Sequence, residues 1–339
     1  MRLFMNKKHT LAAFLAVTML VSCVSTGCGN GGVSALNYRP SMQAAQNVVA
    51  DETSTGSAVY AQEYLSKDIC VIPKDQQSKK NSDSVMTAGA SMIVNDTSQS
   101  MLFSKNIYKK MYPASITKIV TALVTLKYGN LDDTVTFSHN AVTITEPGAK
   151  LCGFQEGDQI KLKDLLYSFL VYSGNDAGVA IAEQVAGSVD KFVALMNQEA
   201  ADLGCVGSHF VNPHGLHDDK HYTTVYDLYL FFHELLQYDT FVDIINQASY
   251  NPKYTDKNGT KHQKFFRSTD RYLIGTAKAP SGVTVIGGKT GTTAKAGSCL
   301  ILYSKDKKKN GYISVVLNAA GGESLYLQMN KLLEYIPKK

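Results

Sequence analysis

The chain has 339 residues, of which 44% are apolar, enough to bury a sizeable core in one large domain or two small ones. The formal net charge is +5, but Arg2, Lys7 and Lys8 supply three of these charges, which leaves +2 for the remainder. So small a charge gives no reason to expect a nucleic-acid partner.

The N-terminus has the layout of a signal peptide. A basic stretch precedes an apolar run at residues 11–21, and about a dozen apolar residues are too few to cross a hydrocarbon layer of about 30 Å. The run ends in the string LVSC at 20–23, which resembles a bacterial lipobox. We therefore expect a lipoprotein signal peptide at 1–22 and lipidation of Cys23. An ordinary signal peptide with a chance cysteine, or lipidation of Cys28, are the alternatives.

A lipid on Cys23 would hold the exported protein at the outer face of the bacterial cytoplasmic membrane, since each buried CH₂ contributes about 0.8 kcal/mol. Residues 23–83 are rich in Ser, Gly, Asn, Gln and Lys and lack sustained periodicity, which is typical of a flexible polar linker. The remaining residues, 84–339, are expected to form the folded domain.

Strands are expected at both ends of this domain and helices in its middle. The strand patterns lie at 88–94, 101–103, 283–288, 298–304 and 312–318, with a tight turn at Asn310-Gly311. The helical patterns lie at 113–129, 162–171, 177–185, 189–203, 225–236 and 324–335. This order indicates an α+β fold whose single sheet is assembled from both ends of the domain.

Six cysteines occur, and no pair has the CxxC spacing. Neither a zinc cluster nor a disulfide framework is therefore indicated. Cys152, Cys205 and Cys299 are expected to be buried as small apolar side chains.

Three short motifs occur in order: SITK at 115–118, SGN at 173–175 and KTG at 289–291. The first two patterns, SxxK and SxN, each recur elsewhere in the chain, so neither is distinctive alone. KTG occurs once. The argument therefore depends on the order of the motifs and on the chemistry that each could perform.

Ser115 follows Pro113 at a predicted helix start, where developing negative charge is favoured. Lys118 falls on the same face, one turn later. A hydroxyl becomes a good nucleophile when a base takes its proton, and a lysine can do so when burial keeps it neutral. The alternative is a helix cap beside a solvated lysine. The residues that follow, IVTALVTL, are apolar nearly all round, which favours a buried helix and a functional lysine.

The other two motifs suit substrate binding. Ser173 and Asn175 lie between two helical patterns, where a hydroxyl and a carboxamide could relay a proton and hold a carbonyl. An ordinary Ser/Asn turn is the alternative. Lys289 follows a strand rich in glycine, which permits close approach of a peptide backbone. Lys289 and Thr290 could then bind a terminal carboxylate. The alternative is a glycine-rich bulge with an exposed lysine.

A histidine cluster offers a different interpretation. His214, His217 and His221 lie near Asp218 and Asp219, with spacings that could suit zinc on a helix. The neighbouring Pro213 and Gly215 break any such helix, so no metal and no cofactor are expected.

The chain resembles a known family, the D-Ala-D-Ala carboxypeptidases, which are low-molecular-mass penicillin-binding proteins and S11 serine peptidases. The resemblance is carried by four segments: YPASITKIVTAL, LVYSGNDAGVAIAE, HFVNPHGLHD and GGKTGTTAKAGSCL. It covers about three quarters of the chain, from residue 84 onwards. It implies a penicillin-binding-protein/β-lactamase-like fold, with a five-stranded antiparallel sheet flanked by helices and a mostly helical subdomain.

The resemblance also implies the roles of the catalytic residues. Ser115 would be the acylated nucleophile, Lys118 its base and Ser173 the proton relay. The backbone N–H groups of Ser115 and Thr292 would form the oxyanion hole.

Substrate binding is implied in the same way. Asn175 would contact the substrate amide, and Lys289, Thr290 and Gly291 would hold the terminal D-Ala. The implied partners are peptidoglycan stem peptides that end in D-Ala-D-Ala, with β-lactams as covalent inhibitors. Many members continue into a second, β-rich domain, which we do not expect here. Asp270 stands where relatives often have Asn, and we assign it no role.

Three functions compete on this reading. The leading one is a carboxypeptidase that releases the terminal D-Ala. The second is a β-lactamase, although no suitable glutamate follows the SGN motif and Glu146 precedes it. The third is a sensor that is acylated by penicillin without turnover.

Overall fold

The computed structural model describes residues 69–71 and 84–338. The predicted leader, Cys23 and most of the predicted linker lie outside the described residues. The tripeptide 69–71 falls within the stretch predicted as linker. In it, the Cys70 N–H donates to the Tyr229 hydroxyl, and the Cys70 carbonyl accepts from the Tyr226 hydroxyl.

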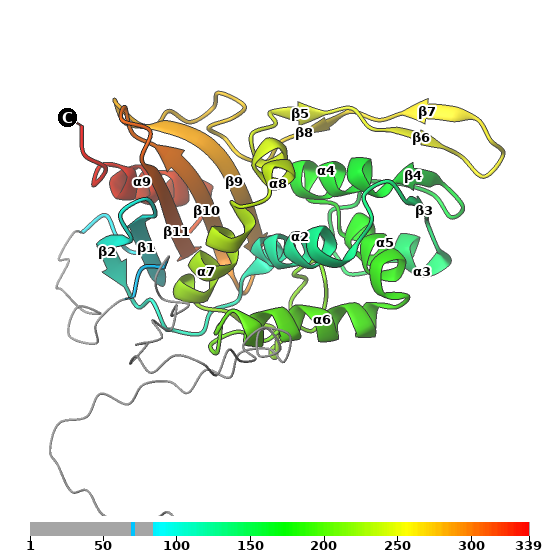
Figure 1. Cartoon of the computed structure of the whole chain (residues 1–339), viewed down its shortest axis with the longest axis horizontal. Helices are drawn as coiled ribbons and strands as arrows, with labels where there is room; N and C mark the ends of the chain where they lie inside the picture. The colour runs from blue at the N-terminus through cyan, green and yellow to red at the C-terminus, as the bar shows by residue number, and fades with distance from the viewer. Residues whose placement is uncertain (1–68, 72–83, 339) are drawn as a thin grey trace, which may run out of the picture. The chain divides into compact units, whose positions relative to one another are not determined.

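Five antiparallel strands form the main sheet, in the order β2–β1–β11–β10–β9. The strands are β1 (Ala90–Asn95), β2 (Ser100–Lys105), β9 (Thr284–Thr293), β10 (Gly297–Lys305) and β11 (Gly311–Ala319). Figure 1 shows the cyan strands β1 and β2 beside the orange strands from the other end of the domain. The predicted α+β fold, with one sheet built from both ends of the domain, is confirmed.

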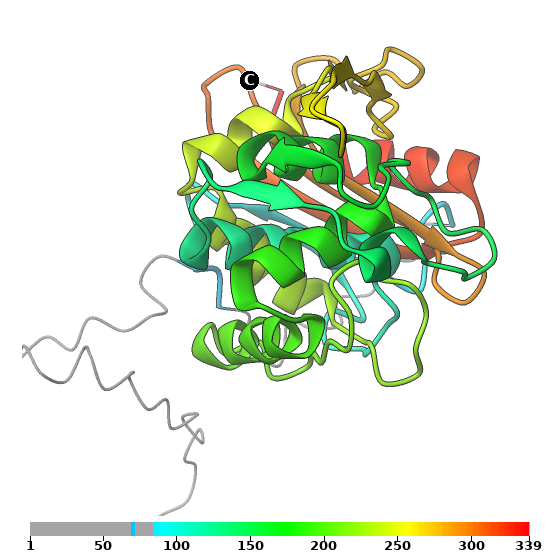
Figure 2. The same cartoon turned by 90° about the vertical axis from the view of Figure 1, so that its right-hand side faces the viewer.

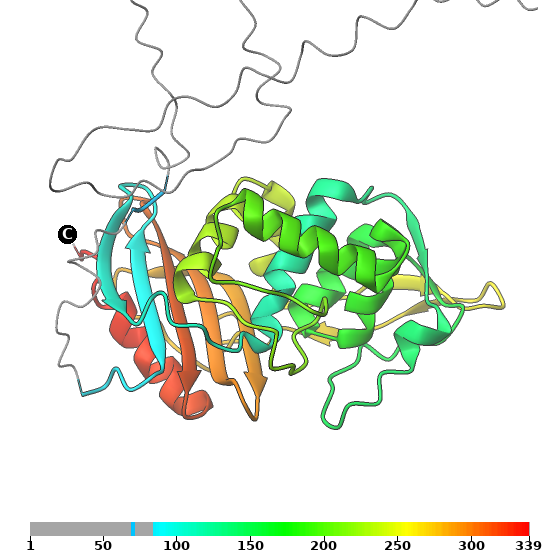
Figure 3. The same ribbon diagram turned by 90° about the horizontal axis from the view of Figure 1, so that it is seen from below.

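Helices cover both faces of this sheet. Alternate residues of a strand point to opposite sides, so apolar residues at successive positions give the sheet two apolar faces to bury. Ile93 of β1 packs in the same apolar cluster as Leu325, Met329 and Leu332 of α9 (Gly322–Leu333). Its neighbour Met92 packs instead in the cluster formed by the other helices. The spacing of the α9 residues gives that helix one apolar stripe. Figure 3 shows α9 apart from the helical region.

The helical region surrounds α2 (Thr117–Tyr128), which follows the short 3-10 helix η3 (Ala114–Ile116). The first nine residues of α2, Thr117 to Thr125, are all buried. Its neighbours are α4 (Leu162–Tyr172), α5 (Asn175–Ala186), α6 (Val189–Asp202) and α7 (Val225–Leu235). Figure 2 shows how these helices pack in front of the sheet. The prediction of a buried helix after Ser115 is confirmed.

Several small elements were not predicted. They are the helices α3 (His139–Val142) and α8 (Asp239–Ile245), a four-stranded sheet of β3 (Thr134–Thr136), β4 (Gln159–Lys161), β6 (Lys253–Thr255) and β7 (Lys261–Gln263), and the pair β5 (Ser249–Tyr250) and β8 (Phe266–Arg267). The strands among them have two or three residues each, too few for an alternating pattern to emerge. None of the described helices has the length and apolarity needed to cross a bilayer.

Two predicted boundaries need correction. The KTG motif does not end its strand, because β9 continues to Thr293 and pairs Gly291 with Cys299 of β10. The connection between β10 and β11 is residues 306–310, shorter than the predicted 305–311, because Lys305 and Gly311 belong to the strands. It is organised by the Asp306 carboxylate, which accepts the N–H groups of Lys308 and Asn310. The three cysteines predicted to be buried, Cys152, Cys205 and Cys299, are buried and free.

Candidate active site

Ser115 lies in η3, against the edge strand β9. Gly291 makes this close packing possible, since a Cβ at Gly291 would lie 2.9 Å from the Ser115 nitrogen. On the other side, Gly215 has a φ of +87°, and a Cβ there would collide with the Ala114 carbonyl. Two glycines therefore fix the backbone on either side of the serine, where a side chain would displace it.

Lys118 is fully buried one turn after Ser115. Its Nζ lies 3.1 Å from Ser115 Oγ, 2.7 Å from Asn175 Oδ1 and 2.6 Å from the His214 carbonyl oxygen. Burial, and then the nearby Lys289 cation, hold the pKa of Lys118 well below its ordinary value. The side chain is thus held against the hydroxyl, in surroundings that favour its neutral, basic form.

The SGN motif joins α4 to α5. Ser173 ends α4 in the left-handed conformation, with a φ of 74°, and Asn175 begins α5. The Asn175 N–H donates to the Lys150 carbonyl at 2.7 Å. Gly174 is required between them because a Cβ there would lie 2.6 Å from the Cys152 nitrogen. This tight junction turns both polar side chains toward the buried lysines.

Lys289 of β9 is also buried, with 1% of its surface exposed. Its Nζ donates to Ser173 Oγ at 2.8 Å and to the Thr290 carbonyl at 2.9 Å. Burial, and then the Lys150 cation, lower the pKa of Lys289 to about 7, against an opposing contribution from Asp270. Ser173 therefore accepts a hydrogen bond from an ammonium group whose pKa lies near neutral pH.

A cleft of about 740 Å³ brings the three motifs together. Six of the predicted site residues line this cleft: Ser115, Ser173, Asn175, Thr290, Gly291 and Thr292. The two buried lysines lie behind this lining and reach it through the hydrogen bonds given above. The structure thus brings residues of all three motifs together at one cleft.

Some residues at this site were not predicted. The His214 carbonyl binds Lys118, and the Thr269 hydroxyl hydrogen bonds to the Thr290 hydroxyl at 2.6 Å. Arg271 lines the cleft and pairs with Glu323. A backbone carbonyl leaves no signature in the sequence. The stretch around Thr269 carries no recognisable motif of its own.

Asp270, to which no role was assigned, is buried next to this site. Its Oδ1 accepts the Tyr272 N–H at 2.9 Å. Burial raises the pKa of this carboxyl to about 6, and the Lys289 cation opposes that rise.

The histidine cluster takes part in the protein's own hydrogen bonds. His221 Nε2 lies 2.7 Å from the Thr117 hydroxyl, and its Nδ1 accepts the Val211 N–H. His214 Nδ1 accepts the Leu216 N–H. Within residues 69–71 and 84–338, no three His, Cys, Asp or Glu side chains are grouped so that they could hold a metal ion.

Comparison with known proteins matches residues 76–321 to the family model of peptidase S11, described as D-alanyl-D-alanine carboxypeptidase. The chain is 31% identical to D-alanyl-D-alanine carboxypeptidase DacF of Bacillus subtilis, over 77% of this chain and 64% of that protein. It is 32% identical to DacC of Escherichia coli, over 73% of this chain and 60% of that protein. The chain therefore spans less than two thirds of the length of these relatives.

The fold is also found in solved structures. The crystal structure of the Streptomyces K15 DD-transpeptidase superimposes with a TM-score of 0.66 at 26% identity, covering 74% of this chain and 97% of that one. Penicillin-binding protein 5 from Haemophilus influenzae gives a TM-score of 0.64 at 27% identity, covering 74% and 70%.

Proposed function

Because the chain belongs to peptidase family S11, the D-alanyl-D-alanine carboxypeptidases, we propose that it removes the terminal D-Ala from peptidoglycan stem peptides through an acyl-enzyme on Ser115. The observation that carries the proposal is the contact between Lys118 Nζ and Ser115 Oγ at 3.1 Å, with the lysine fully buried. A neutral amine held against a hydroxyl is the arrangement that general-base activation requires.

Acylation then proceeds in two steps. Lys118 Nζ takes the hydroxyl proton while Ser115 Oγ attacks the carbonyl carbon of the penultimate D-Ala. The backbone N–H groups of Ser115 and Thr292 stabilise the resulting oxyanion. The C–N bond breaks, and the amine of the departing D-Ala receives the proton from Lys118 by way of the Ser173 hydroxyl. The product is an ester on Ser115 and free D-Ala.

Deacylation reverses the proton movements. Water enters the space that D-Ala has left and gives a proton to Lys118 as it attacks the ester carbonyl. The C–Oγ bond breaks, and Ser115 recovers its proton from Lys118. The same lysine thus serves as base and then as acid in both halves of the reaction.

The terminal carboxylate of the substrate is proposed to lie beside Lys289 and Thr290. A carboxylate there would add an opposite charge next to the buried ammonium and so restore its pKa toward the ordinary range. Asn175, already bonded to Lys118, would bind the substrate amide with its remaining donors. Gly291 and Thr292 line the cleft next to Thr290, so the substrate backbone would lie along this edge of β9.

The direct test is release of D-Ala from a pentapeptide that ends in D-Ala-D-Ala, measured with the purified full-length protein. The matched control peptide ends in L-Ala-L-Ala. We expect the wild-type protein to release the terminal alanine from the first peptide and not from the control peptide. Ser115→Ala should release it from neither. If the wild-type protein is acylated by penicillin but releases no D-Ala, the sensor interpretation replaces the enzyme.

We also propose that the protein is exported and held by a lipid on Cys23 at the outer face of the cytoplasmic membrane. The support is the LVSC string at the end of a short apolar run. Acyl chains would give stable anchoring, and a linker over residues 23–83 would let the catalytic domain reach the wall.

A further inference from the structure

The connection between β8 and β9 brings a second threonine to the KTG motif. The Thr269 hydroxyl lies 2.6 Å from the Thr290 hydroxyl, although the two residues are 21 positions apart in the chain. Both residues of this threonine pair line the catalytic cleft, and Lys289 directly precedes Thr290. The pair therefore lies where the terminal carboxylate of the substrate is proposed to bind.

Hydrogen bonds on both sides of Thr269 fix its backbone. Before it, the Ser268 N–H donates to the Ala248 carbonyl at 2.9 Å. After it, the Asp270 N–H donates to Ser268 Oγ at 3.2 Å, and Asp270 Oδ1 accepts the Tyr272 N–H at 2.9 Å. Asp270 is 2% exposed, so this part of the connection is anchored in the interior. The Thr269 hydroxyl is thus held in position before a substrate arrives.

Two paired hydroxyls leave one proton for a ligand. Each hydroxyl carries one proton and can also accept hydrogen bonds. One of the two protons lies in the bond between Thr269 and Thr290, so the other is available to a different acceptor. If Thr269 donates, Thr290 keeps its own proton for the cleft, and the bond that it accepts polarises its hydroxyl and makes it a better donor. A carboxylate oxygen, which only accepts, suits such a donor.

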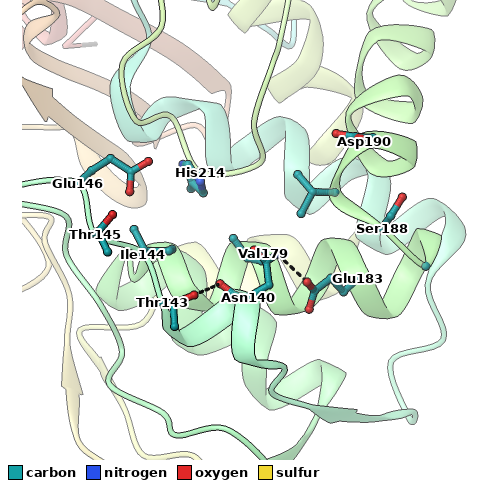
Figure 4. A pocket seen from close by; sticks show the side chains of 12 residues that line it. Asn140, Thr143, Ile144, Thr145, Glu146, Val179, Glu183, Ser188, Asp190 and His214 are labelled. Atoms are coloured by element: carbon teal, nitrogen blue, oxygen red, sulfur yellow. Dashed lines mark hydrogen bonds between the residues drawn. The ribbon is translucent and has the colours of Figure 1, made fainter.

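The charges along the cleft favour an anion at the threonine pair. Among the described residues of the cleft lining, Glu146 is the one acidic side chain. Figure 4 shows it on the loop that follows α3, where it also lines a neighbouring pocket on the helical side. Arg271, which pairs with the exposed Glu323, lines the cleft from the same connection as the first threonine of the pair. Cations thus flank the pair in sequence, whereas the carboxylate belongs to a different element.

We propose that Thr269 is a positioning residue for the terminal carboxylate of the substrate: its hydroxyl donates to Thr290 Oγ1 and so directs the Thr290 proton toward a carboxylate oxygen. The inference rests on the proposed function, because this carboxylate belongs to the peptide that Ser115 attacks. Loss of the Thr269 hydroxyl should weaken recognition of a charged terminus more than that of a neutral one, because hydrogen bonds to ionised acceptors are roughly twice as strong as neutral ones.

The test removes the Thr269 hydroxyl and compares substrates with a free and an amidated C-terminus. Thr269→Val keeps the shape of the side chain and loses the hydroxyl. With the full-length protein and a peptide that ends in D-Ala-D-Ala, we expect this variant to lower kcat/KM about five- to ten-fold, with most of the change in KM. For the amidated peptide the loss should be less than about two-fold. Thr269→Ser, which keeps the hydroxyl, should behave as the wild-type protein. So should Thr276→Val, at an exposed position of the same connection.

Equal losses for the free and the amidated peptide in Thr269→Val, or no loss for either, would overturn the inference, since a purely structural role affects both peptides alike. So would a loss in Thr269→Ser as large as that in Thr269→Val.

Failure of the proposed function gives a different result, the absence of D-Ala release by the wild-type protein. The rates of acylation by penicillin and by its methyl ester then decide the role of Thr269. A slower rate in Thr269→Val for penicillin alone supports the inference, and the same change or no change for both compounds contradicts it. If the wild-type protein reacts with neither compound, both proposals fall.

Discussion

Lys118 Nζ lies 3.1 Å from Ser115 Oγ, and no part of the lysine side chain reaches solvent. The two residues are three apart, one in η3 and the other in the first turn of α2, so the helix itself holds the amine beside the hydroxyl. The remaining contacts of the amine, to Asn175 and to the His214 carbonyl, restrict it to this position.

Replacement of Lys118 should therefore remove the base and leave the nucleophile in place. We expect both Lys118→Ala and Lys118→Arg to lower kcat/KM by about 10²- to 10⁴-fold, since arginine keeps the charge but does not give up its proton. Because the pKa of Lys118 lies well below its ordinary value, the wild-type rate should rise with pH through that lowered pKa. Full activity in Lys118→Arg would exclude the lysine as base.

Lys289 should control recognition of the terminal carboxylate. Amidation of the substrate C-terminus should lower kcat/KM about 10- to 100-fold in the wild-type protein, the usual range for a hydrogen bond between charged groups. The loss should be much smaller in Lys289→Ala, where the cation is already absent. The pKa of Lys289 is lowered to about 7, so the ammonium form predominates below that pH and KM should rise above it. Equal losses in both proteins would remove Lys289 from this role.

Acid should destabilise the protein through its buried histidines. Burial lowers the pKa of His214 and His221 to about 3, against 6.5 for an ordinary histidine. Between these values the unfolded chain binds more protons, so the free energy of unfolding falls as the pH falls. Asp270 has the opposite effect, because burial raises the pKa of its carboxyl from 3.8 to about 6. Between these two pH values the folded state binds more protons at Asp270 than the unfolded chain does, so this residue stabilises the fold as the pH falls.

Urea unfolding at about pH 4.5 and about pH 7.5 measures this effect. We expect a lower midpoint at the acidic pH, and a smaller difference between the two in His221→Asn, because one of the two contributing histidines is absent. His139→Asn, at an exposed position, serves as the control. If the difference between the two urea midpoints is as large in His221→Asn as in the wild-type protein, buried His221 is not a source of the acid destabilisation.

The proposed tether can be tested by metabolic labelling with fatty acid. We expect label on the wild-type protein and none on Cys23→Ala, which should also leave the membrane fraction. Cys28→Ala should keep both the label and the location. Label retained on Cys23→Ala and lost on Cys28→Ala would instead move the lipid to Cys28.

Much of the site could be predicted because each motif carries its own local signal. The apolar run after Ser115 predicts a buried helix, and this alone places Lys118 out of solvent. What could not be predicted is the assembly between motifs. The contact between Lys289 and Ser173 joins residues 116 positions apart, and the bond from Lys118 to the His214 carbonyl uses a backbone atom. Neither leaves a pattern in the local sequence.

The misplaced end of the KTG strand has a related cause. Gly287, Gly288 and Gly291 interrupt the apolar pattern by which a strand is recognised, yet pairing with β10 keeps the chain extended as far as Thr293. Tertiary pairing overrides local propensity here. The exposed strand β7 illustrates the opposite case, since all three of its residues face solvent and no buried face marks it.

The central claim, an acyl-enzyme on Ser115, is tested most directly by mapping a penicillin adduct. A β-lactam keeps its leaving amine attached after the ring opens, so the space through which water would enter stays blocked, and the adduct should persist. Mass spectrometry of the labelled full-length protein should place the adduct on Ser115. Ser115→Ala should show none and Lys118→Ala much less. An adduct that survives Ser115→Ala, or rapid multiple turnover of penicillin, would contradict the account.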